Sequence, residues 1–386
     1  MTVANSTAGG LAGLRAAIPL LATRAYLFSG GIAPLAGPVR TELATWVDQW
    51  AADPLVHRAD YFGAWGRLRD EFAQLVGADP DEVAVTENTS RATNLALRLL
   101  GLPAGSTVLV DDTTYPTMAW AAISHGLRVR QVRPTPGQAP VDAFAAALDA
   151  GTSCVAVSHV SALDGYRHDL AALAGLAADR GVRLLVDVAQ SAGVVPVDLR
   201  RDGIDALVGT AMKWLLGPPG VGFLAVRAEA VAADGCPDVG YVSARIGDTY
   251  QLTELPQLPT GATRTEVGLA ALPLLAAATA GIRLIRDAGV ATIAGQVERL
   301  VQRVCAGLAS QGVPVDSPRD SATRAGIVVL RVPAATQLAD QLRRGGVDVW
   351  GYPSGRVRVD PHGFNDDDDI DRLLAGIAAF RTGNDR

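Results

Sequence analysis

Lysine is almost missing from this sequence: of its 34 lysines and arginines, only residue 213 is a lysine. Arginine keeps its proton in proteins, whereas a desolvated lysine amine can lose its proton and form a Schiff base with an aldehyde. A genome that favours alanine, glycine and arginine codons explains why lysine is rare. It does not explain why one lysine remains, between a strand-like run and a loop rich in glycine and proline. Lys213 is therefore our first candidate for a covalent role.

Cysteine, aromatic residues and surplus positive charge are scarce as well. Cys154, Cys236 and Cys305 lie far apart in the chain, without the spacing of a metal site or of a disulfide framework. The net charge is -6 and no arginine run is interleaved with aromatic residues, so nucleic acid and anionic membranes are not expected as partners. The sequence shows no leader-like start and no uninterrupted apolar run that spans a bilayer, which predicts a cytoplasmic location.

The chain is long and apolar enough for more than one domain. Its 386 residues favour two or three domains, and its 49% of hydrophobic residues supply large cores. Because only 5% of the residues are aromatic, those cores must consist mainly of alanine, valine and leucine. Before residue 83, helical periodicity predicts helices over 11–21, 38–52 and 65–76.

From residue 83 onward, short β-branched runs alternate with helical stretches. The predicted strands are 83–86, 108–111, 129–132, 154–160, 184–188, 206–209 and 221–226, with helices at 91–100, 118–125, 141–150 and 170–180. Most of the strands are apolar throughout, as strands covered on both faces must be. This alternation predicts an α/β fold with a mostly parallel, doubly wound sheet. Ligands of such sheets bind at the carboxyl ends of the strands.

Polar side chains follow these predicted strands. Thr89 and Ser90 open a helix after the first strand, either as ordinary helix caps or as a seat for a phosphate at the positive end of the helix dipole. Tyr115, His159 and Asp187 follow the second, fourth and fifth strands, and the lone lysine follows the sixth. An aspartate at the end of a buried strand needs a partner, and a pyridinium nitrogen would serve as one.

These residues match the chemistry of pyridoxal 5'-phosphate (PLP). The lysine can react with its aldehyde and the aspartate can pair with its ring nitrogen. An aromatic side chain can cover the ring face, and a helix start can bind the phosphate. On these residues the chain resembles the fold-type I PLP enzymes of the class V aminotransferase family, in the branch of isopenicillin N epimerase-like proteins and carbon–sulfur lyases. The resemblance runs from about residue 26 to the C-terminus. Its most specific parts are Leu-Val-Asp-Val-Ala-Gln-Ser-Ala-Gly at 185–193 and Lys-Trp-Leu-Leu-Gly-Pro-Pro-Gly-Val-Gly at 213–222.

The resemblance implies a role for each matching residue. Lys213 would form the Schiff base, Asp187 would pair with the pyridine nitrogen, and Gln190 would bond the 3-hydroxyl. The other expected cofactor contacts are Thr89, Ser90 and Thr210 at the phosphate, Tyr115 or His159 on the ring, and Thr260 or Thr263 at the phosphate of a neighbouring subunit. The expected substrate contacts are Arg358 as clamp of an α-carboxylate, Arg356 as its helper or competitor, and Ser29 and Gly30.

The chain departs from the family pattern at three places. Ala162 stands where many relatives carry an asparagine at the 3-hydroxyl, and Met212 stands where many carry a histidine at the phosphate. Both changes remove a polar contact to the cofactor. No cysteine lies in the segment before Arg356, where cysteine desulfurases carry their nucleophile, so we do not expect a cysteine desulfurase.

The resemblance also implies the domain plan and the assembly. We expect an N-terminal arm over 1–28 that packs with the small domain, a PLP-binding large domain with the seven-stranded sheet over 29–285, and a smaller C-terminal α/β domain over 286–386. In the last of these, the patterns predict helices at 293–308, 338–344 and 371–380 and a strand at 326–332. The acidic run at 365–370 fits an asparagine cap and an acidic first helical turn, and no metal site is expected. A homodimer with its active site at the subunit interface is expected.

The reaction itself is not written in short motifs, because PLP stabilises whichever carbanion the protein lets form at Cα. Our first prediction is carbon–sulfur β-elimination from a cysteine S-conjugate, which needs one base and a leaving group. The alternative is transamination, epimerisation or decarboxylating oxidation of an amino acid carried by a natural product. An inactive PLP-fold subunit is disfavoured by the intact lysine and aspartate. A nucleotide-binding role for the glycine-rich loop at 217–222 is disfavoured because the loop follows the lysine.

Overall fold

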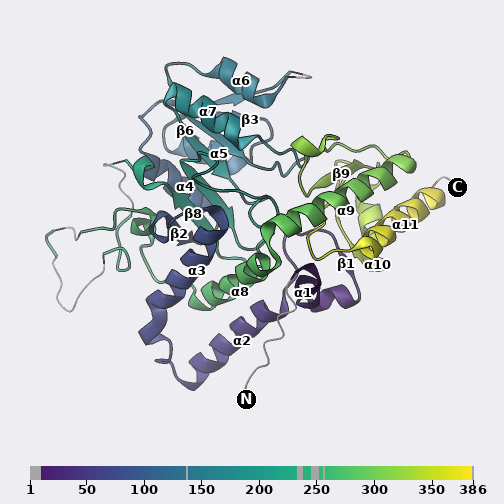
Figure 1. Cartoon of the computed structure of the whole chain (residues 1–386), viewed down its shortest axis with the longest axis horizontal. Coiled ribbons are helices and arrows are strands. Elements are labelled where there is room, and N and C mark those ends of the chain that lie inside the picture. The colour runs from purple at the N-terminus through teal and green to yellow at the C-terminus, as the bar shows by residue number, and fades with distance from the viewer. Residues whose placement is uncertain (1–9, 136–137, 233–237, 245–251, 255–256, 385–386) are drawn as a thin grey trace.

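The largest sheet of the computed structural model has seven strands, and it lies to one side of the C-terminal elements (Figure 1). The structure describes residues 10–135, 138–232, 238–244, 252–254 and 257–384. The strands are β2 (Val83–Thr86), β3 (Thr107–Asp111), β4 (Arg128–Val132), β5 (Thr152–Ser158), β6 (Arg183–Asp187), β7 (Ala206–Thr210) and β8 (Gly222–Val226). They lie in the order β2-β8-β7-β6-β5-β3-β4, and every neighbouring pair is parallel except the two pairs that β8 makes. The predicted α/β fold with a mostly parallel sheet of seven strands is confirmed.

Helices cover both faces of this sheet, as its apolar strands require. The helices on one face are α3 (Tyr61–Val76), α6 (Pro140–Ala147), α7 (Leu170–Arg180) and α8 (Leu272–Ala288), and those on the other are α4 (Thr89–Leu100) and α5 (Pro116–Ser124). Successive side chains of a strand point to opposite faces. Leu184 therefore joins the first of these two cores while Leu185 joins the second.

Two helix predictions need correction, and one helix was not predicted. The stretch 11–21 is two elements, α1 (Leu11–Ala16) and the short 3-10 helix η1 (Pro19–Ala22), because a proline has no N–H with which to continue a helix. The predicted helix over 141–150 ends at Ala147, and the sequence patterns do not predict α8 at all. By contrast, α2 (Gly37–Ala52), α4 and α7 lie where the periodicity predicts them.

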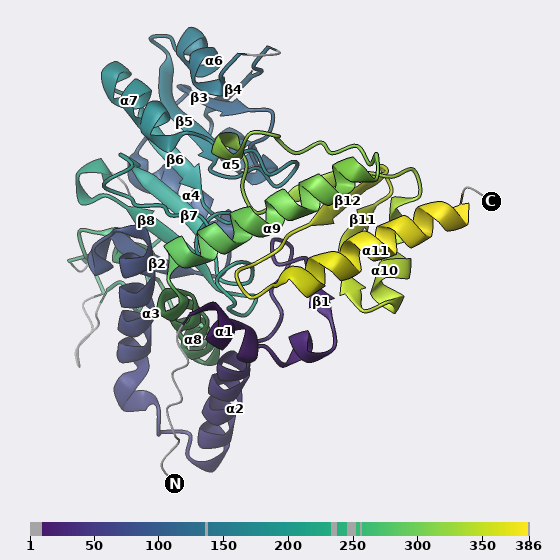
Figure 2. The same ribbon diagram turned by 45° about the vertical axis from the view of Figure 1, so that its right-hand side comes forward.

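A second, smaller sheet forms the C-terminal part of the chain. Its order is β11-β12-β9, all antiparallel, and α9, α10 and α11 pack around it (Figure 2). The elements are α9 (Val290–Ser310), β9 (Val328–Arg331), α10 (Ala335–Arg344), β11 (Trp350–Tyr352), β12 (Arg356–Val359) and α11 (Asp367–Asn384). The acidic run begins α11 but its cap differs from the prediction. Asp366 Oδ1 accepts from the Asp369 N–H at 3.1 Å, whereas Asn365 Oδ1 accepts from the His362 N–H at 2.8 Å.

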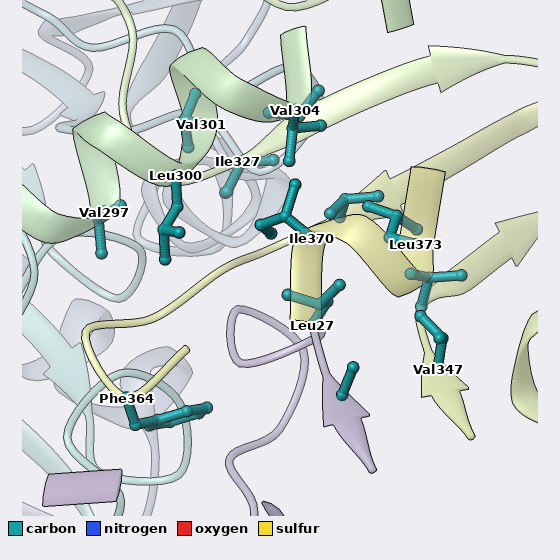
Figure 3. Close-up of a cluster of buried hydrophobic side chains, with 14 of the residues drawn as sticks. Leu27, Val297, Leu300, Val301, Val304, Ile327, Val347, Phe364, Ile370 and Leu373 are labelled. Carbon is teal, nitrogen blue, oxygen red and sulfur yellow. The ribbon is translucent and has the colours of Figure 1, made fainter. Parts of the chain in front are cut away.

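The N-terminal segment packs against this C-terminal part. Strand β1 (Ala25–Tyr26) pairs in parallel with β10 (Val347–Asp348), and Arg15 Nη1 lies 2.8 Å from Asp369 Oδ2. Figure 3 shows Leu27 in the same buried cluster as Leu300 of α9 and Leu373 of α11. The boundaries at 28/29 and 285/286 stay a prediction, and the second of them falls within α8.

Candidate active site

The carboxyl ends of β5, β6 and β7 are neighbours, and the residues singled out from the sequence follow them. Ser158 at the end of β5 pairs with Asp187 at the end of β6, and Asp187 pairs with Val208 of β7. The loop after β7 carries Lys213. Because these strands are parallel, His159, Asp187 and Lys213 all lie at one edge of the sheet.

Lys213 lies in a tight loop that is mostly buried. The loop includes Leu216, the one non-glycine residue in the described part of the chain with a positive φ, at 57°. Such a conformation is costly for leucine and is commonly found at functional sites. Burial lowers the pKa of the Lys213 ammonium, Asp187 opposes this shift and Arg358 adds to it. A lowered pKa increases the fraction of neutral amine, the form that attacks an aldehyde.

Asp187 is a deeply buried carboxylate next to this lysine. Its Oδ1 accepts from the Ala189 N–H at 2.8 Å, and only 5% of the residue is exposed. Burial raises the pKa of Asp187, while the Ala189 N–H and Lys213 lower it. A buried carboxylate is stabilised by a cation beside it, and a protonated ring nitrogen would supply one.

Two aromatic side chains belong to the same edge of the sheet. His159 is 4% exposed, and its Nδ1 has no hydrogen-bond partner among the described residues. Burial lowers the pKa of His159 to about 3, so the imidazole is neutral. Tyr115 is largely exposed, and its ring centroid lies 6.0 Å from Lys213 Nζ. The two alternatives for the stacking residue stay open.

The start of α4 offers free backbone donors. Asn88 Oδ1 accepts from the Arg91 N–H at 2.9 Å. The first N–H groups of a helix have no partner within the helix, so those of Thr89 and Ser90 remain for a ligand. Ser90 Oγ lies 3.4 Å from Thr117 Oγ1 in the first turn of α5. Thr117 is a hydroxyl that the sequence analysis did not select, although a threonine in the first turn of a helix after a strand is a recognisable signal.

The glycine-rich loop brings β8 against this helix start. A Cβ added at Gly222 would lie 2.5 Å from the backbone carbon of Asn88, so only glycine permits this approach. Thr210, the last residue of β7, donates its hydroxyl to the Val221 carbonyl at 3.2 Å. The loop therefore packs the cap of α4 close to the end of β7, which suits a shared phosphate seat.

Arg358 is the second buried cation of the site. It projects from β12, and its side chain is 5% exposed. Its Nε donates to Asp360 Oδ1 at 2.8 Å, its Nη1 to the Ala162 carbonyl at 3.2 Å, and its Nη2 to Gln190 Oε1 at 3.1 Å. Burial raises the pKa of the Asp360 carboxyl, and Arg358 lowers it. Tyr352 is a further hydrogen-bond partner of this guanidinium, so at least three of its five N–H groups are used.

The other predicted substrate contacts surround this arginine. A Cβ on Gly30 would lie 2.1 Å from Arg358 Nη2, so a larger residue there would displace the end of this arginine. Ser29 is fully buried, and its hydroxyl has no partner among the described residues. Arg356 lies on the same face of β12, partly exposed, 5.8 Å from the Tyr352 ring centroid.

Gln190 is more heavily engaged than the resemblance implies. Its Nε2 donates to the Gly30 carbonyl at 3.0 Å. Its Oε1 accepts from Trp214 Nε1 at 2.9 Å as well as from Arg358. One N–H of the amide remains for a ligand hydroxyl. Sequence reasoning missed Asp360 and Trp214 as supports of this end of the site, because their contacts depend on the tertiary fold.

Thr260 and Thr263 lie elsewhere in this chain. The 3-10 helix η5 (Ala262–Thr265) packs beside β2, the outer strand of the large sheet, and Gly261 abuts the Asp81 carbonyl. Strand β8 separates β2 from the strand that precedes Lys213. Their expected contact with the cofactor of a neighbouring subunit stays a prediction.

Comparison with known proteins identifies the family to which this chain belongs. A family model described as aminotransferase class-V matches residues 25–349. The chain belongs to this family. It is 30% identical to isopenicillin N epimerase from Streptomyces clavuligerus over 81% of this chain and 84% of that protein. It is 27% identical to the uncharacterized aminotransferase YcbU from Bacillus subtilis (strain 168) over 95% of this chain and 96% of that one.

Solved structures of other proteins superpose on almost the whole length of this class-V chain. The apo cysteine desulfurase from Thermococcus onnurineus NA1 has a TM-score of 0.82 and 26% identity, covering 96% of this chain and 98% of that one. The cystine C-S lyase C-DES, in complex with its product cysteine persulfide, has a TM-score of 0.84 and 24% identity, covering 94% and 99%. Because C-DES is only 24% identical to this chain, its similarity shows the fold alone. The PLP-transferase fold is confirmed.

The cofactor of this class-V chain is PLP, and the residues present fit it. The neutral imidazole of His159 has a free Nδ1, Asp187 is a buried carboxylate in need of a cation, and Lys213 has a lowered pKa. In the described residues, no group of three or more histidine, cysteine, aspartate or glutamate side chains is placed to hold a metal ion. Among the helices so described, none is both long and apolar enough to cross a membrane.

Proposed function

We propose that the chain binds an α-amino acid at the PLP site and breaks a carbon–sulfur bond by β-elimination. The observation that carries the proposal is a desolvated Lys213 and a buried Arg358 at one site, close enough for their charges to interact. The Arg358 guanidinium can pair with an α-carboxylate, and Lys213 is the group able to move a proton at Cα.

In the proposed β-elimination, Lys213 and Arg358 have separate roles. Lys213 takes the Cα proton, the Cβ–S bond breaks, and the electron pair leaves with the thiolate sulfur. Bound PLP supplies the electron withdrawal that makes the Cα proton acidic. Hydrolysis of the remaining fragment gives a 2-oxo acid and ammonia. Arg358 holds the carboxylate throughout, so that the Cα–H bond stays oriented toward Lys213.

We further propose that the chain is not a cysteine desulfurase, although solved desulfurases share its fold. A desulfurase needs a reactive thiolate. Burial raises the pKa of Cys154 to about 12 and also raises the pKa of Cys305, so neither thiol is activated. Cys236 lies outside the described residues, and no cysteine precedes Arg356 in its segment.

The assembly proposed is a cytoplasmic homodimer with the active site at the subunit interface. Large apolar side chains stand exposed around α2 and the start of α3, which supports an interface there. They are Val47, Trp50, Leu55, Val56 and Phe62. In such a dimer, Thr260 or Thr263 would reach the cofactor of the partner.

The experiment that tests the reaction measures products from cysteine S-conjugates and cystine. β-Elimination yields a thiol or persulfide, a 2-oxo acid and ammonia in equal amounts. Release of alanine with sulfur retained on the protein would instead show desulfuration and would overturn the proposal.

Epimerisation is the second candidate, because the chain is 30% identical to an isopenicillin N epimerase over most of its length. It would appear as inversion at Cα with deuterium uptake from solvent and without loss of sulfur. Transamination would appear as a 2-oxo acid that retains the side chain, formed only when an amino-group acceptor is present.

Arg358→Ala should raise KM for amino acids by about 10²-fold, through the loss of about 2–4 kcal/mol of charge-assisted hydrogen bonding. The absorbance of the bound cofactor should stay nearly unchanged. The matched control is Arg356→Ala, on the same face of β12 but partly exposed, where a much smaller effect is expected. A large rise in KM for Arg356→Ala alone would place the clamp two residues earlier. Equal rates for matched amines without the carboxylate would remove the clamp altogether.

A further inference from the structure

A buried contact between a histidine and an aspartate joins the two loops that carry the candidate ring-stacking residues. His168 Nε2 lies 2.9 Å from Asp111 Oδ2, and the two side chains are 2% and 3% exposed. Asp111 is the last residue of β3, and His168 lies between β5 and α7. Neither residue belongs to the cofactor contacts described above.

On the β3 side, Asp111 fixes the loop that leads to Tyr115. Its Oδ1 accepts from the Thr113 N–H at 3.1 Å and from the Thr114 hydroxyl at 2.6 Å, and its Oδ2 accepts from the Thr113 hydroxyl at 2.8 Å. The next residue, Tyr115, donates its backbone N–H to Ser158 Oγ at 2.9 Å. The backbone at Tyr115 is thus tied to the end of β5.

On the β5 side, His168 supports the segment that carries His159. The His168 N–H donates to the His159 carbonyl at 2.9 Å, and the His159 N–H donates to the Asp187 carbonyl at 2.9 Å. The Tyr166 ring packs edge-on against the His168 ring, with centroids 5.0 Å apart. A short chain of contacts therefore runs from Asp111 through His168 and His159 to Asp187.

The surroundings of Asp111 set its charge. Burial alone would raise the pKa of Asp111, but His168 and the hydroxyls of Thr114 and Thr113 hold it at about 2, so the residue is a carboxylate. Removing one member of a buried pair leaves the other uncompensated, so the loops would shift to solvate it.

We propose that Asp111 and His168 form a positioning pair that holds Tyr115 and His159 against the cofactor ring. The inference rests on the proposed placement of the ring beside His159, Asp187 and Lys213. The pair touches neither substrate nor reacting atoms, and it acts by fixing the distance between two loops. Misplacement of catalytic groups by about 1 Å can cost on the order of 10²-fold in rate.

The test compares two variants of the holoenzyme, His168→Phe and His168→Gln. Phenylalanine keeps the ring but cannot bond Asp111, whereas the glutamine amide places an N–H where the imidazole Nε2 stands. We expect His168→Phe to shift the absorbance maximum of the bound cofactor, to weaken PLP binding about tenfold and to lower kcat more than it raises KM. We expect His168→Gln to restore most of the wild-type spectrum and affinity.

The matched control is Asp205→Asn, which removes a buried carboxylate at the opposite end of the sheet. Asp205 precedes β7 and accepts from Arg183 at 3.0 Å, from Arg227 at 2.8 Å and from the Leu184 N–H at 2.8 Å. Its replacement should lower the melting temperature without moving the cofactor spectrum. If His168→Phe gives that same pattern, the pair is merely structural and the proposal is wrong.

Failure of folding does not leave the question open. If His168→Phe is insoluble, Asp111→Asn and His168→Gln are compared instead. A shifted cofactor spectrum in Asp111→Asn together with a wild-type spectrum in His168→Gln supports the positioning pair. Wild-type spectra in both variants overturn the proposal. If wild-type protein binds PLP but eliminates no sulfur, the proposed reaction fails. The positioning role is still judged, from the spectrum and the PLP affinity.

Discussion

Lys213→Ala is expected to abolish both covalent PLP binding and turnover. The chain holds no other lysine, so no second side-chain amine can take over the Schiff base. The measurement is borohydride reduction of the PLP-loaded protein followed by mass spectrometry. The wild type should carry one pyridoxyl group on the peptide that contains residue 213, and the variant should carry none.

The control for this experiment is Lys213→Arg, which keeps the positive charge and most of the length but cannot lose its proton at accessible pH. It should behave like the alanine variant if Schiff-base chemistry is what matters. Turnover by Lys213→Arg, or pyridoxyl label on either variant chain, would show that Lys213 is not the reacting amine.

The large sheet was predictable because its strands are covered on both faces. An apolar run as short as the one at β6, bounded by polar residues, is typical of a strand buried on both sides. The predicted seven strands match β2 to β8 to within a few residues at each end. Strand β4 was the hardest of these, because it lies at the edge of the sheet and is largely exposed.

Helix α8 escaped prediction for a physical reason. Its side chains enter two cores at once: Leu275 and Ile282 pack with the large sheet, whereas Ala277 and Ile285 pack with the C-terminal part. Apolar residues therefore occur on several sides of the helix, and the one-sided period that marks a surface helix is blurred.

The predicted site residues that follow strands lie together because parallel strands end at one edge of a sheet, whatever the sequence separation. Partners that come from other elements carry no such signal. Asp360 beside Arg358, and His168 beside Asp111, are acidic or basic residues like many others until the fold brings them into contact. The same limit applies to Thr260 and Thr263, whose expected contact requires a second chain.

Asp187→Asn is expected to lower turnover by about 10³-fold or more, because a neutral amide no longer stabilises a protonated ring nitrogen in a buried site. The amide has nearly the same shape as the carboxylate and its oxygen can still accept from the Ala189 N–H. The cofactor should therefore remain bound, with the loss confined mainly to kcat. The measurements are kcat with the preferred substrate and the PLP content of the purified variant.

Asp205→Asn again supplies the comparison, since it makes the same chemical change in a buried carboxylate that lies away from the site. Its kcat should stay within a few-fold of wild type when both are assayed well below their melting temperatures. A kcat of Asp187→Asn close to that of Asp205→Asn, with PLP fully bound in both, would show that Asp187 does not support the ring nitrogen. The buried carboxylate would then be a structural group, held by its backbone N–H and by the charge of Lys213.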